Sequence, residues 1–415
     1  MGSQLDVFLN NELIGHLWLE QKRRFTFQYT DEWIKYSRAA SISLSLPLRE
    51  QLYSDDEAHP FFSNLLPEAD IRRVIAAKLG ISEENDFVLL EIMGGECAGA
   101  VSVVPTGVLP TTQNEYKEID EITLHEIVIS LPHKPLMAGE EGIRLSLAGA
   151  QNKLPIYIKN DKISIPIGSS PSTHILKTPM RDRDGTVENE AFCMMLAHKI
   201  GIPVPPVKVR RNSDTLYVIQ RYDRRVGPGD KISRIHQEDF CQALCIPPNQ
   251  KYQSEGGPSL KDCFDLLKKQ SISPAMDQKT LISWVVFNVL IGNADAHGKN
   301  VSILFTDIGP RLAPFYDLLC TKVYPDLSDK LAMKVGGENR SEWIQLRHWE
   351  RFAEEINIKP KLVLKIVESM ASNIVDNAKY VDEVFCKENG SSPIIEKIIS
   401  VISKMSRKVM LSLKI

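Results

Sequence analysis

Apolar and polar positions divide the chain into stretches with different periods. Apolar residues alternate along LDVFLNNELIGHLWL (5–19) around an Asn-Asn turn, which predicts a β-hairpin. In FFSNLLPEADIRRVIAAKLG (61–80) they recur every three or four residues up to a glycine, which predicts one helix ending at Gly80. GAVSVVP (99–105) predicts a closing strand, and the polar run 106–120 predicts a connection to a second unit.

Strand-like segments dominate from about 140 to 222, and helical segments follow from 236. The predicted strands lie in 142–158, 162–167, 173–177 and 216–222, and one helix, 188–201, interrupts them. The later helices are predicted at 239–244, 259–270, 281–292 and from about 345. We therefore expect an α+β fold with a small α/β unit (1–120), a strand-rich unit (121–224) and a helical unit (225–415).

The composition is typical of a globular protein and narrows the location. Hydrophobic residues make up 43% of the 415 residues and charged residues 25%, with a net charge of −3. This balance removes the general electrostatic argument for binding nucleic acid or a membrane. The N-terminus lacks signal-peptide features, and the longest apolar run, 281–292, is too short to span a bilayer. We expect a cytoplasmic protein.

The seven cysteines form no CxxC pair. An odd number without this spacing favours reduced, buried thiols over a disulfide framework or a zinc site. Cys241 and Cys245 are spaced to share one helix face, and core packing explains them without a metal.

The strongest chemical signal is the polar cluster Asn293-Ala-Asp-Ala-His-Gly-Lys-Asn300 between an apolar helix and a predicted strand. Polar groups between buried elements are costly unless they are used. Phosphoryl transfer needs a carboxylate base, a cation near the phosphate and oxygen ligands for Mg²⁺, and Asp295, Lys299 and Asn300 supply these types. The Asp-x-x-x-x-Asn spacing is also that of protein-kinase catalytic loops.

Asp317, seventeen residues after Asn300, is the second expected Mg²⁺ ligand. It stands in Tyr316-Asp317-Leu318, where kinases carry DFG, although the glycine is absent and a loop cap explains an isolated aspartate equally well. Asp295 and His297, separated by one residue, could also be two ligands of a metal hydrolase, but the neighbouring sequence offers no further ligands with suitable spacing. We expect His297 to hold the loop by hydrogen bonding, close to the nucleotide.

Two upstream segments are candidates for nucleotide phosphates. The small residues of RLSLAGAQNK (144–153) would let backbone N–H groups approach phosphates, although an ordinary β-hairpin between two strands would explain the same sequence. Lys177 ends a predicted strand, where it could pair with the α- and β-phosphates or be an ordinary exposed lysine. Glu190 could position Lys177, or it could be one of the acidic residues that interact favourably with the N-terminal end of a helix dipole. The phosphate-loop candidates are Ala148, Gly149, Ala150, Gln151 and Lys153.

The segment LYVIQRYDRR (216–225) would form the hinge between the strand-rich and helical units. Adenine is usually bound by backbone groups and a flat side chain, so the Gln220 backbone and Tyr222 are candidates. Arg224, Arg225 and the basic residues at 208, 210 and 211 lack interleaved aromatics, and a solvated face explains them better than a nucleic-acid patch.

These motifs together resemble the HipA-type protein kinases. GNADAHGKN, YDLL, SLAGAQNK, STHILK, QRYDR and RIHQEDFCQAL occur in the family's order, and FFSNLLPE and GGECAGAVSVVP resemble the N-terminal domain of its full-length members. The likeness covers about residues 5–350. It implies a two-lobed kinase-like fold, ATP and Mg²⁺ as cofactors, Asp295 as catalytic base, and Ser146 as a serine whose autophosphorylation expels the phosphate loop and switches the enzyme off.

The resemblance also implies partners. These are a HipB-like helix-turn-helix antitoxin, DNA only through that antitoxin, and a protein substrate such as an aminoacyl-tRNA synthetase, with no membrane. Gln220 departs from the family's usual hinge glutamate, and Gly298 is expected to loosen the catalytic loop. A nucleotide-binding pseudokinase that acts as a corepressor and a small-molecule phosphotransferase remain alternatives. The intact catalytic residues argue against the first, and the SLAGAQNK loop and N-terminal domain against the second.

Overall fold

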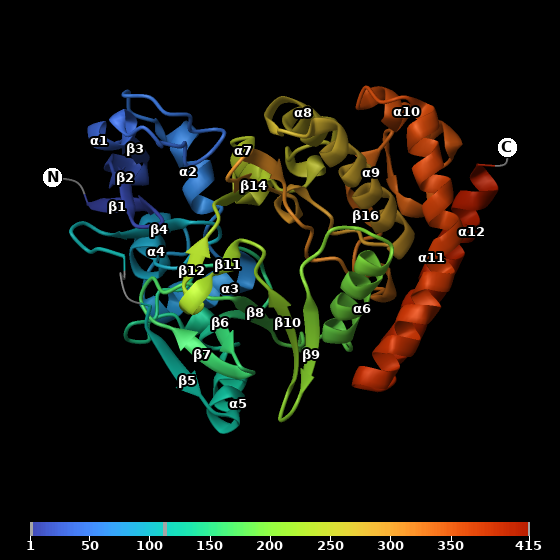
Figure 1. The fold of residues 1–415 in the computed structure, drawn as a ribbon, viewed down its shortest axis with the longest axis horizontal. Helices are drawn as coiled ribbons and strands as arrows, with labels where there is room; N and C mark the ends of the chain where they lie inside the picture. Colours follow the sequence, from blue (N-terminus) through green and yellow to red (C-terminus); the bar gives the residue numbers. More distant parts are fainter. Residues whose placement is uncertain (1–2, 111–113, 414–415) are drawn as a thin grey trace.

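The computed structural model describes residues 3–110 and 114–413, so residues 111–113 of the predicted connection lie outside the description. The first unit is a four-stranded antiparallel sheet in the order β3-β2-β1-β4 (Figure 1). Its elements are β1 (Gln4–Leu9), β2 (Glu12–Leu19), β3 (Phe25–Tyr29), β4 (Val101–Pro105), α1 (Asp31–Lys35), α2 (Asp55–Ser63), α3 (Ala69–Leu79) and α4 (Asp86–Met93). The predicted hairpin is confirmed, with Leu9 paired to Glu12.

The helix predicted across 61–80 is wrong as a single element. Helix α2 ends at Ser63, and α3 begins at Ala69, so residues 64–68 form a loop. Pro67 explains the break, because proline has no N–H and disfavours helical backbone in the residue before it. The predicted stop at Gly80 is confirmed, since this glycine caps α3 in the left-handed conformation.

The second unit is built on a six-stranded sheet in the order β5-β7-β6-β8-β10-β9. It contains β5 (Tyr116–Ile119), α5 (Glu121–Ser130), β6 (Lys153–Lys159), β7 (Lys162–Pro166), β8 (His174–Lys177), α6 (Thr186–Lys199), β9 (Val207–Arg211) and β10 (Thr215–Gln220). The predicted strand at 142–158 begins only at Lys153, and the residues before it form the SLAGAQN loop. We propose that the three units divide near residues 120 and 224. Strand β5 ends just before the first boundary, but it pairs with β7 and so belongs to the second sheet.

The third unit is mainly helical (Figure 1). Helices α7 (Phe240–Ala243), α8 (Leu260–Gln270), α9 (Pro274–Ile291), α10 (Leu346–Glu355), α11 (Pro360–Asn389) and α12 (Pro393–Ser412) confirm the predicted helices. Three small sheets join them: β11 (Arg224–Val226) with β12 (Ile232–Arg234); β13 (Gln237–Asp239), β14 (Ser302–Thr306) and β15 (Gly309–Leu312); and β16 (Lys330–Val335) with β17 (Glu338–Arg340). Among the described residues, no helix is long and apolar enough to cross a bilayer.

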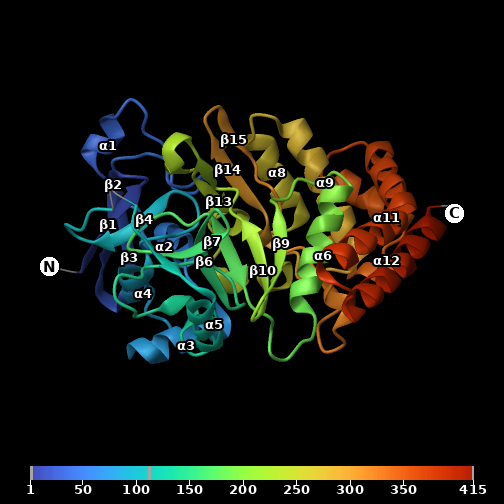
Figure 2. The same cartoon turned by 60° about the horizontal axis from the view of Figure 1, so that its bottom comes forward.

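Two hydrophobic cores meet at the six-stranded sheet. One joins the first unit to one face of that sheet, and the other packs α6 and the remaining face against the helical unit (Figure 2). Strand β10 shows the alternation, because Leu216 belongs to the first core, whereas Tyr217 and Ile219 belong to the second. The face that carries Tyr217 therefore looks toward the helical unit.

Candidate active site

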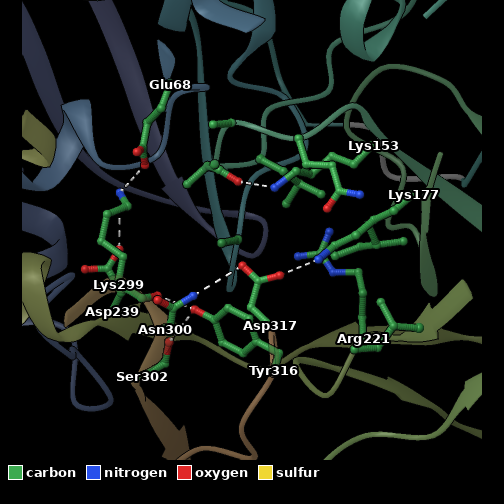
Figure 3. A pocket seen from close by; sticks show the side chains of 18 of the residues that line it. Glu68, Lys153, Lys177, Arg221, Asp239, Lys299, Asn300, Ser302, Tyr316 and Asp317 are labelled. Atoms are coloured by element: carbon green, nitrogen blue, oxygen red, sulfur yellow. Dashed lines mark hydrogen bonds and ion pairs between the residues drawn. The ribbon is translucent and has the colours of Figure 1, made fainter. Parts of the chain in front are cut away.

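A cavity of about 310 Å³ lies where the three units meet (Figure 3). Its walls come from the loop after α2, the SLAGAQN loop, the ends of β8 and β10, and the loops after α9 and β15. Every site residue predicted from the sequence except Ser146 lines it. These residues are Ala148, Gly149, Ala150, Gln151, Lys153, Lys177, Gln220, Tyr222, Asp295, His297, Lys299, Asn300 and Asp317.

The catalytic-loop candidate follows α9, which ends at Gly292 in the left-handed conformation (φ 69°). Asp295 projects into the cavity with 48% of its side chain exposed. Its backbone N–H donates to Asn293 Oδ1 at 3.0 Å, and one carboxylate oxygen, Oδ1, accepts a hydrogen bond from the Tyr252 hydroxyl. The carboxylate is thus held from one side and open on the other.

His297 is buried inside the loop. Burial lowers the pKa of His297 to about 4, so the ring is neutral at physiological pH. Its backbone N–H donates to Asn300 Oδ1 at 3.1 Å, which closes the short turn to Asn300. The expectation that Gly298 loosens the loop is wrong, because a Cβ there would lie 2.5 Å from Pro258 and 3.0 Å from Cys241 Sγ. The glycine permits close packing.

The Lys299 ammonium points to the first unit rather than to the open cavity (Figure 3). It donates to Asn64 Oδ1 at 2.5 Å and lies 3.2 Å from Glu68 and 3.5 Å from Asp239 carboxylate oxygens. Lys251 pairs with the other oxygen of Glu68 at 2.8 Å. The structure therefore places Lys299 in a buried, charge-balanced cluster.

Asn300 and Asp317 lie next to each other in the cavity. Asn300 Nδ2 donates a hydrogen bond to Asp317 Oδ2 at 3.2 Å, while Asn300 Oδ1, the atom that could bind a metal, accepts the His297 N–H. Asp317 has a left-handed backbone (φ 57°), a conformation that costs energy for a residue other than glycine and recurs at functional sites. Burial opposes its charge, but the ammonium groups of Lys177 and Lys153 hold the pKa of Asp317 well below its usual range. An ionised carboxylate and an amide are oxygen donors that fit Mg²⁺.

Lys177 lies at the centre of the cleft because of strand register. Lys153, Lys177 and Tyr217 are directly paired on β6, β8 and β10, so their side chains share one face of the sheet. Lys177 Nζ is 2.7 Å and 3.0 Å from the two oxygens of Glu190 and also pairs with Asp317. Burial lowers the pKa of Lys177, but these two carboxylates outweigh that effect and raise it. The lysine is charged and not surface-exposed.

Glu190 is a residue that the sequence reasoning undervalued. It lies on the buried face of α6, where a helix-dipole role does not explain a carboxylate. Burial raises the pKa of Glu190 despite its pairing with Lys177. The sequence signal for a buried Glu190 is the apolar run Phe192, Cys193 and Met194 that follows it. In the structure this helix is buried nearly all round.

The SLAGAQN loop is tied to the first unit and to the rest of its own unit. Lys153 Nζ donates to the Ala148 carbonyl at 2.5 Å, Gln151 Nε2 donates to the Thr178 carbonyl at 3.1 Å, and Gly149 has φ 110°. The Glu68 N–H donates to the Gly149 carbonyl at 3.3 Å. Burial and, next in size, the charge of Lys177 lower the pKa of Lys153 to about 8.

Ser146, the first residue of the loop, is buried and does not line the cavity. It is 0% exposed, its hydroxyl donates to the Leu65 carbonyl at 2.8 Å, and its N–H donates to the Glu96 carbonyl at 2.9 Å. The hydroxyl therefore points to the first unit, away from Asp295.

The hinge candidate is only partly as predicted. Gln220 lies exposed at the end of β10, and Tyr222 stacks on Tyr316 with ring centroids 6.0 Å apart. The expectation of a solvated face is wrong for Arg224, which is buried in an ionic cluster with Glu96 at 2.9 Å and Asp223 at 3.0 Å. Two further arginines, Arg221 and Arg234, complete this cluster.

Sequence reasoning missed the residues around the catalytic loop that the first unit, the end of β13 and the 248–255 segment supply. No spacing connects them to the catalytic loop, because they are brought there only by the fold. These residues are Asn64, Glu68, Asp239, Lys251 and Tyr252.

Two family models match the chain: the HipA N-terminal domain over residues 5–104 and the HipA-like C-terminal domain over residues 145–378. The Y4mE protein of Sinorhizobium fredii, classed as a candidate kinase, is 43% identical over 381 residues, which cover 90% of this chain and 89% of Y4mE. The serine/threonine-protein kinase toxin HipA of Shewanella oneidensis is 29% identical over 388 residues, which cover 89% of this chain and 87% of that protein.

A solved structure of Shewanella oneidensis HipA, in a complex with HipB and its operator DNA, has the same fold. It superposes with a TM-score of 0.85 at 26% identity and covers 99% of this chain and 97% of that chain. The superposition confirms the α+β, HipA-like fold expected from the sequence.

Proposed function

The chain belongs to the HipA family, and on that basis we propose that it is a toxin-type protein serine/threonine kinase that uses ATP and Mg²⁺. The observation that carries the proposal is the meeting of Asp295, Asn300, Asp317 and Lys177 in one cavity. A carboxylate open to an acceptor, a pair of oxygen ligands and a buried lysine are the groups that phosphoryl transfer requires.

In this mechanism Asp295 is the general base. The acceptor hydroxyl oxygen attacks the γ-phosphorus of ATP, its proton passes to the Asp295 carboxylate, and the bond between the γ-phosphorus and the bridging oxygen breaks to release ADP. Lys177, oriented by Glu190, holds the α- and β-phosphates. Asn300 and Asp317 would hold Mg²⁺, which when bound neutralises charge on the phosphates.

The remaining nucleotide contacts follow from the cavity walls. Backbone groups of residues 148–151 and the Lys153 ammonium would bind phosphate oxygens, while the Gln220 backbone and Tyr222 would contact adenine. His297 has a neutral ring and lies in the catalytic loop between Asp295 and Asn300. Its backbone N–H donates to Asn300 and so supports the loop that carries both residues. Lys299 anchors the catalytic loop to the first unit, as its contacts with Glu68 and Asp239 support.

Ser146 is proposed as the autophosphorylation site that inactivates the enzyme. Its burial means that the loop must leave its place before the hydroxyl can reach a phosphate. About two negative charges on phosphoserine could not be accommodated against the Leu65 and Glu96 carbonyls, so the loop would stay out. Mass spectrometry after incubation with ATP tests this, and an active enzyme without phosphate on Ser146 would contradict it.

The partners are proposed from the family. A HipB-like antitoxin, with operator DNA bound through it, is supported by the complex of the Shewanella oneidensis relative. A translation component such as an aminoacyl-tRNA synthetase, in the cytoplasm, is the proposed substrate class.

The deciding experiment measures transfer of labelled γ-phosphate from Mg-ATP to the protein itself and to proteins of a cell lysate, with Asp295→Asn as the control. The proposal expects labelled protein for the wild type and none for the variant. Equal labelling would remove Asp295 as base. Nucleotide binding without any transfer would favour a pseudokinase, and a labelled metabolite alone would favour a small-molecule phosphotransferase.

A further inference from the structure

Tyr252 makes a direct contact with the proposed catalytic base. Its hydroxyl donates a hydrogen bond of 2.5 Å to Asp295 Oδ1. The tyrosine belongs to a segment between two short 3₁₀-helices, Pro248–Gln250 and Gln253–Glu255, and the neighbouring Lys251 lines the cavity. Among the described residues the hydrogen bond to the Asp295 carboxylate falls on Oδ1, and the side chain of Asp295 remains 48% exposed.

The backbone around Tyr252 is firmly held. The N–H groups of Glu255 and Gly257 both donate to the Tyr252 carbonyl at 2.9 Å. A Cβ on Gly257 would lie 2.3 Å from the Gln250 carbonyl oxygen, so this turn accepts only glycine. These contacts fix the point from which the side chain leaves the chain.

The side chain is held from two further directions. The ring meets the buried His297 ring edge to face, with centroids 5.2 Å apart and an angle of 88° between the planes. The neighbouring Lys251 is paired with Glu68 of the first unit at 2.8 Å. The segment is therefore held against the catalytic loop through the Tyr252 ring and against the first unit through Lys251.

We propose that Tyr252 is the positioning residue for Asp295: its hydroxyl fixes one carboxylate oxygen and leaves the other directed at the acceptor hydroxyl. The inference rests on the proposed kinase function and deepens it. An aspartate side chain rotates freely about its terminal bonds when exposed, whereas base catalysis needs a carboxylate oxygen within hydrogen-bond reach of the acceptor. A donor on Oδ1 removes that freedom.

The Tyr252 hydroxyl must stay protonated to donate this hydrogen bond. Burial and the nearby Asp295 charge raise the pKa of Tyr252, so the phenol remains a donor. Of the other groups around Asp295, His297 is neutral with a pKa of about 4, and Lys251 and Glu68 neutralise each other.

The test is Tyr252→Phe, which keeps the ring against His297 and removes only the donor. At saturating Mg-ATP we expect kcat for protein phosphorylation to fall about tenfold at pH 7, with KM for ATP within about twofold of wild type. Tyr380→Phe, on the exposed side of α11, is the matched control and should behave as wild type.

Two further variants separate the possible failures. Lys251→Met keeps the phenol and removes the ion pair of its neighbour, so it should lower kcat less than Tyr252→Phe does; an equal or larger fall in kcat would overturn the inference. If Asp295→Asn retains wild-type transfer, the proposed function itself is wrong. If Asp295→Asn is inactive but Tyr252→Phe matches wild type in kcat, or is faster, only the positioning role is refuted.

Discussion

Glu68 links the first unit to the catalytic loop, and its removal is expected to destabilise the protein. Its carboxylate is 12% exposed and contacts Lys299 at 3.2 Å and Lys251 at 2.8 Å. In Glu68→Gln the shape is preserved, but Lys251 loses its carboxylate partner and Lys299 keeps only Asp239, at 3.5 Å. An uncompensated buried charge is among the costliest defects that one substitution can create.

The magnitude follows from the pKa of Glu68. Burial alone would raise this pKa, but Lys299 and Lys251 outweigh burial and hold it at about 2, against 4.5 for an unperturbed glutamate. That difference corresponds to roughly 3 kcal/mol of stability at neutral pH, similar to the cost of breaking a buried ion pair. An unfolding entropy of about 2.1 cal/mol/K per residue is roughly 0.9 kcal/mol/K for 415 residues, so a midpoint lower by about 3 °C is expected at pH 7.

The assay is thermal unfolding of the wild type and Glu68→Gln between pH 7 and pH 4. Because the folded-state pKa is depressed, the stabilisation is complete above about pH 4.5 and is lost as the pH falls toward 2. The gap between the two proteins should thus narrow by roughly a quarter at pH 4. Lys261→Met, which breaks the exposed pair with Asp265, should melt with the wild type. Equal midpoints for Glu68→Gln and wild type at pH 7 would refute the reasoning.

Further expectations concern the nucleotide side of the cleft. Lys177→Met leaves Asp317 and Glu190 without their shared cation and should lower kcat/KM for ATP by at least about a hundredfold in a phosphate-transfer assay, while a residual rate near wild type would contradict its role. Gly149→Ala places a Cβ 2.5 Å from Lys153 Nζ at a φ of 110°, so KM for ATP should rise about tenfold in steady-state kinetics. Lys153 loses its proton near pH 8, so KM should climb above that pH in wild type and not in Lys153→Arg.

Local spacing explains how much of the site could be predicted. Asp295, Lys299 and Asn300 lie in one short loop, and Asp317 follows a hairpin. The spacing of residues that are near in sequence was therefore enough to predict that they lie together. Strand pattern likewise placed Lys177 at the end of β8. These residues converge because short connections bring their elements together, and such geometry is largely encoded in local sequence.

The contacts that could not be predicted join distant parts of the chain. Glu68 reaches Lys299 across 231 positions, and its loop was hidden inside a continuous helical period that Pro67 interrupts. Arg224 looked like a surface charge because Glu96, its buried partner, is 128 positions away. Periodicity reports which face is buried, but it does not identify what a buried charge pairs with.

The burial of Ser146 has a kinetic consequence. If this serine is the acceptor, phosphate can be added only to a conformer in which its hydrogen bonds to the Leu65 and Glu96 carbonyls are broken. The rate of self-inactivation is then the intrinsic transfer rate multiplied by the population of that open conformer, and each 1.4 kcal/mol that favours closure lengthens the active lifetime about tenfold. Substitutions in the first unit, far from the bound nucleotide, would therefore change the rate of self-inactivation while the turnover of other substrates stays the same.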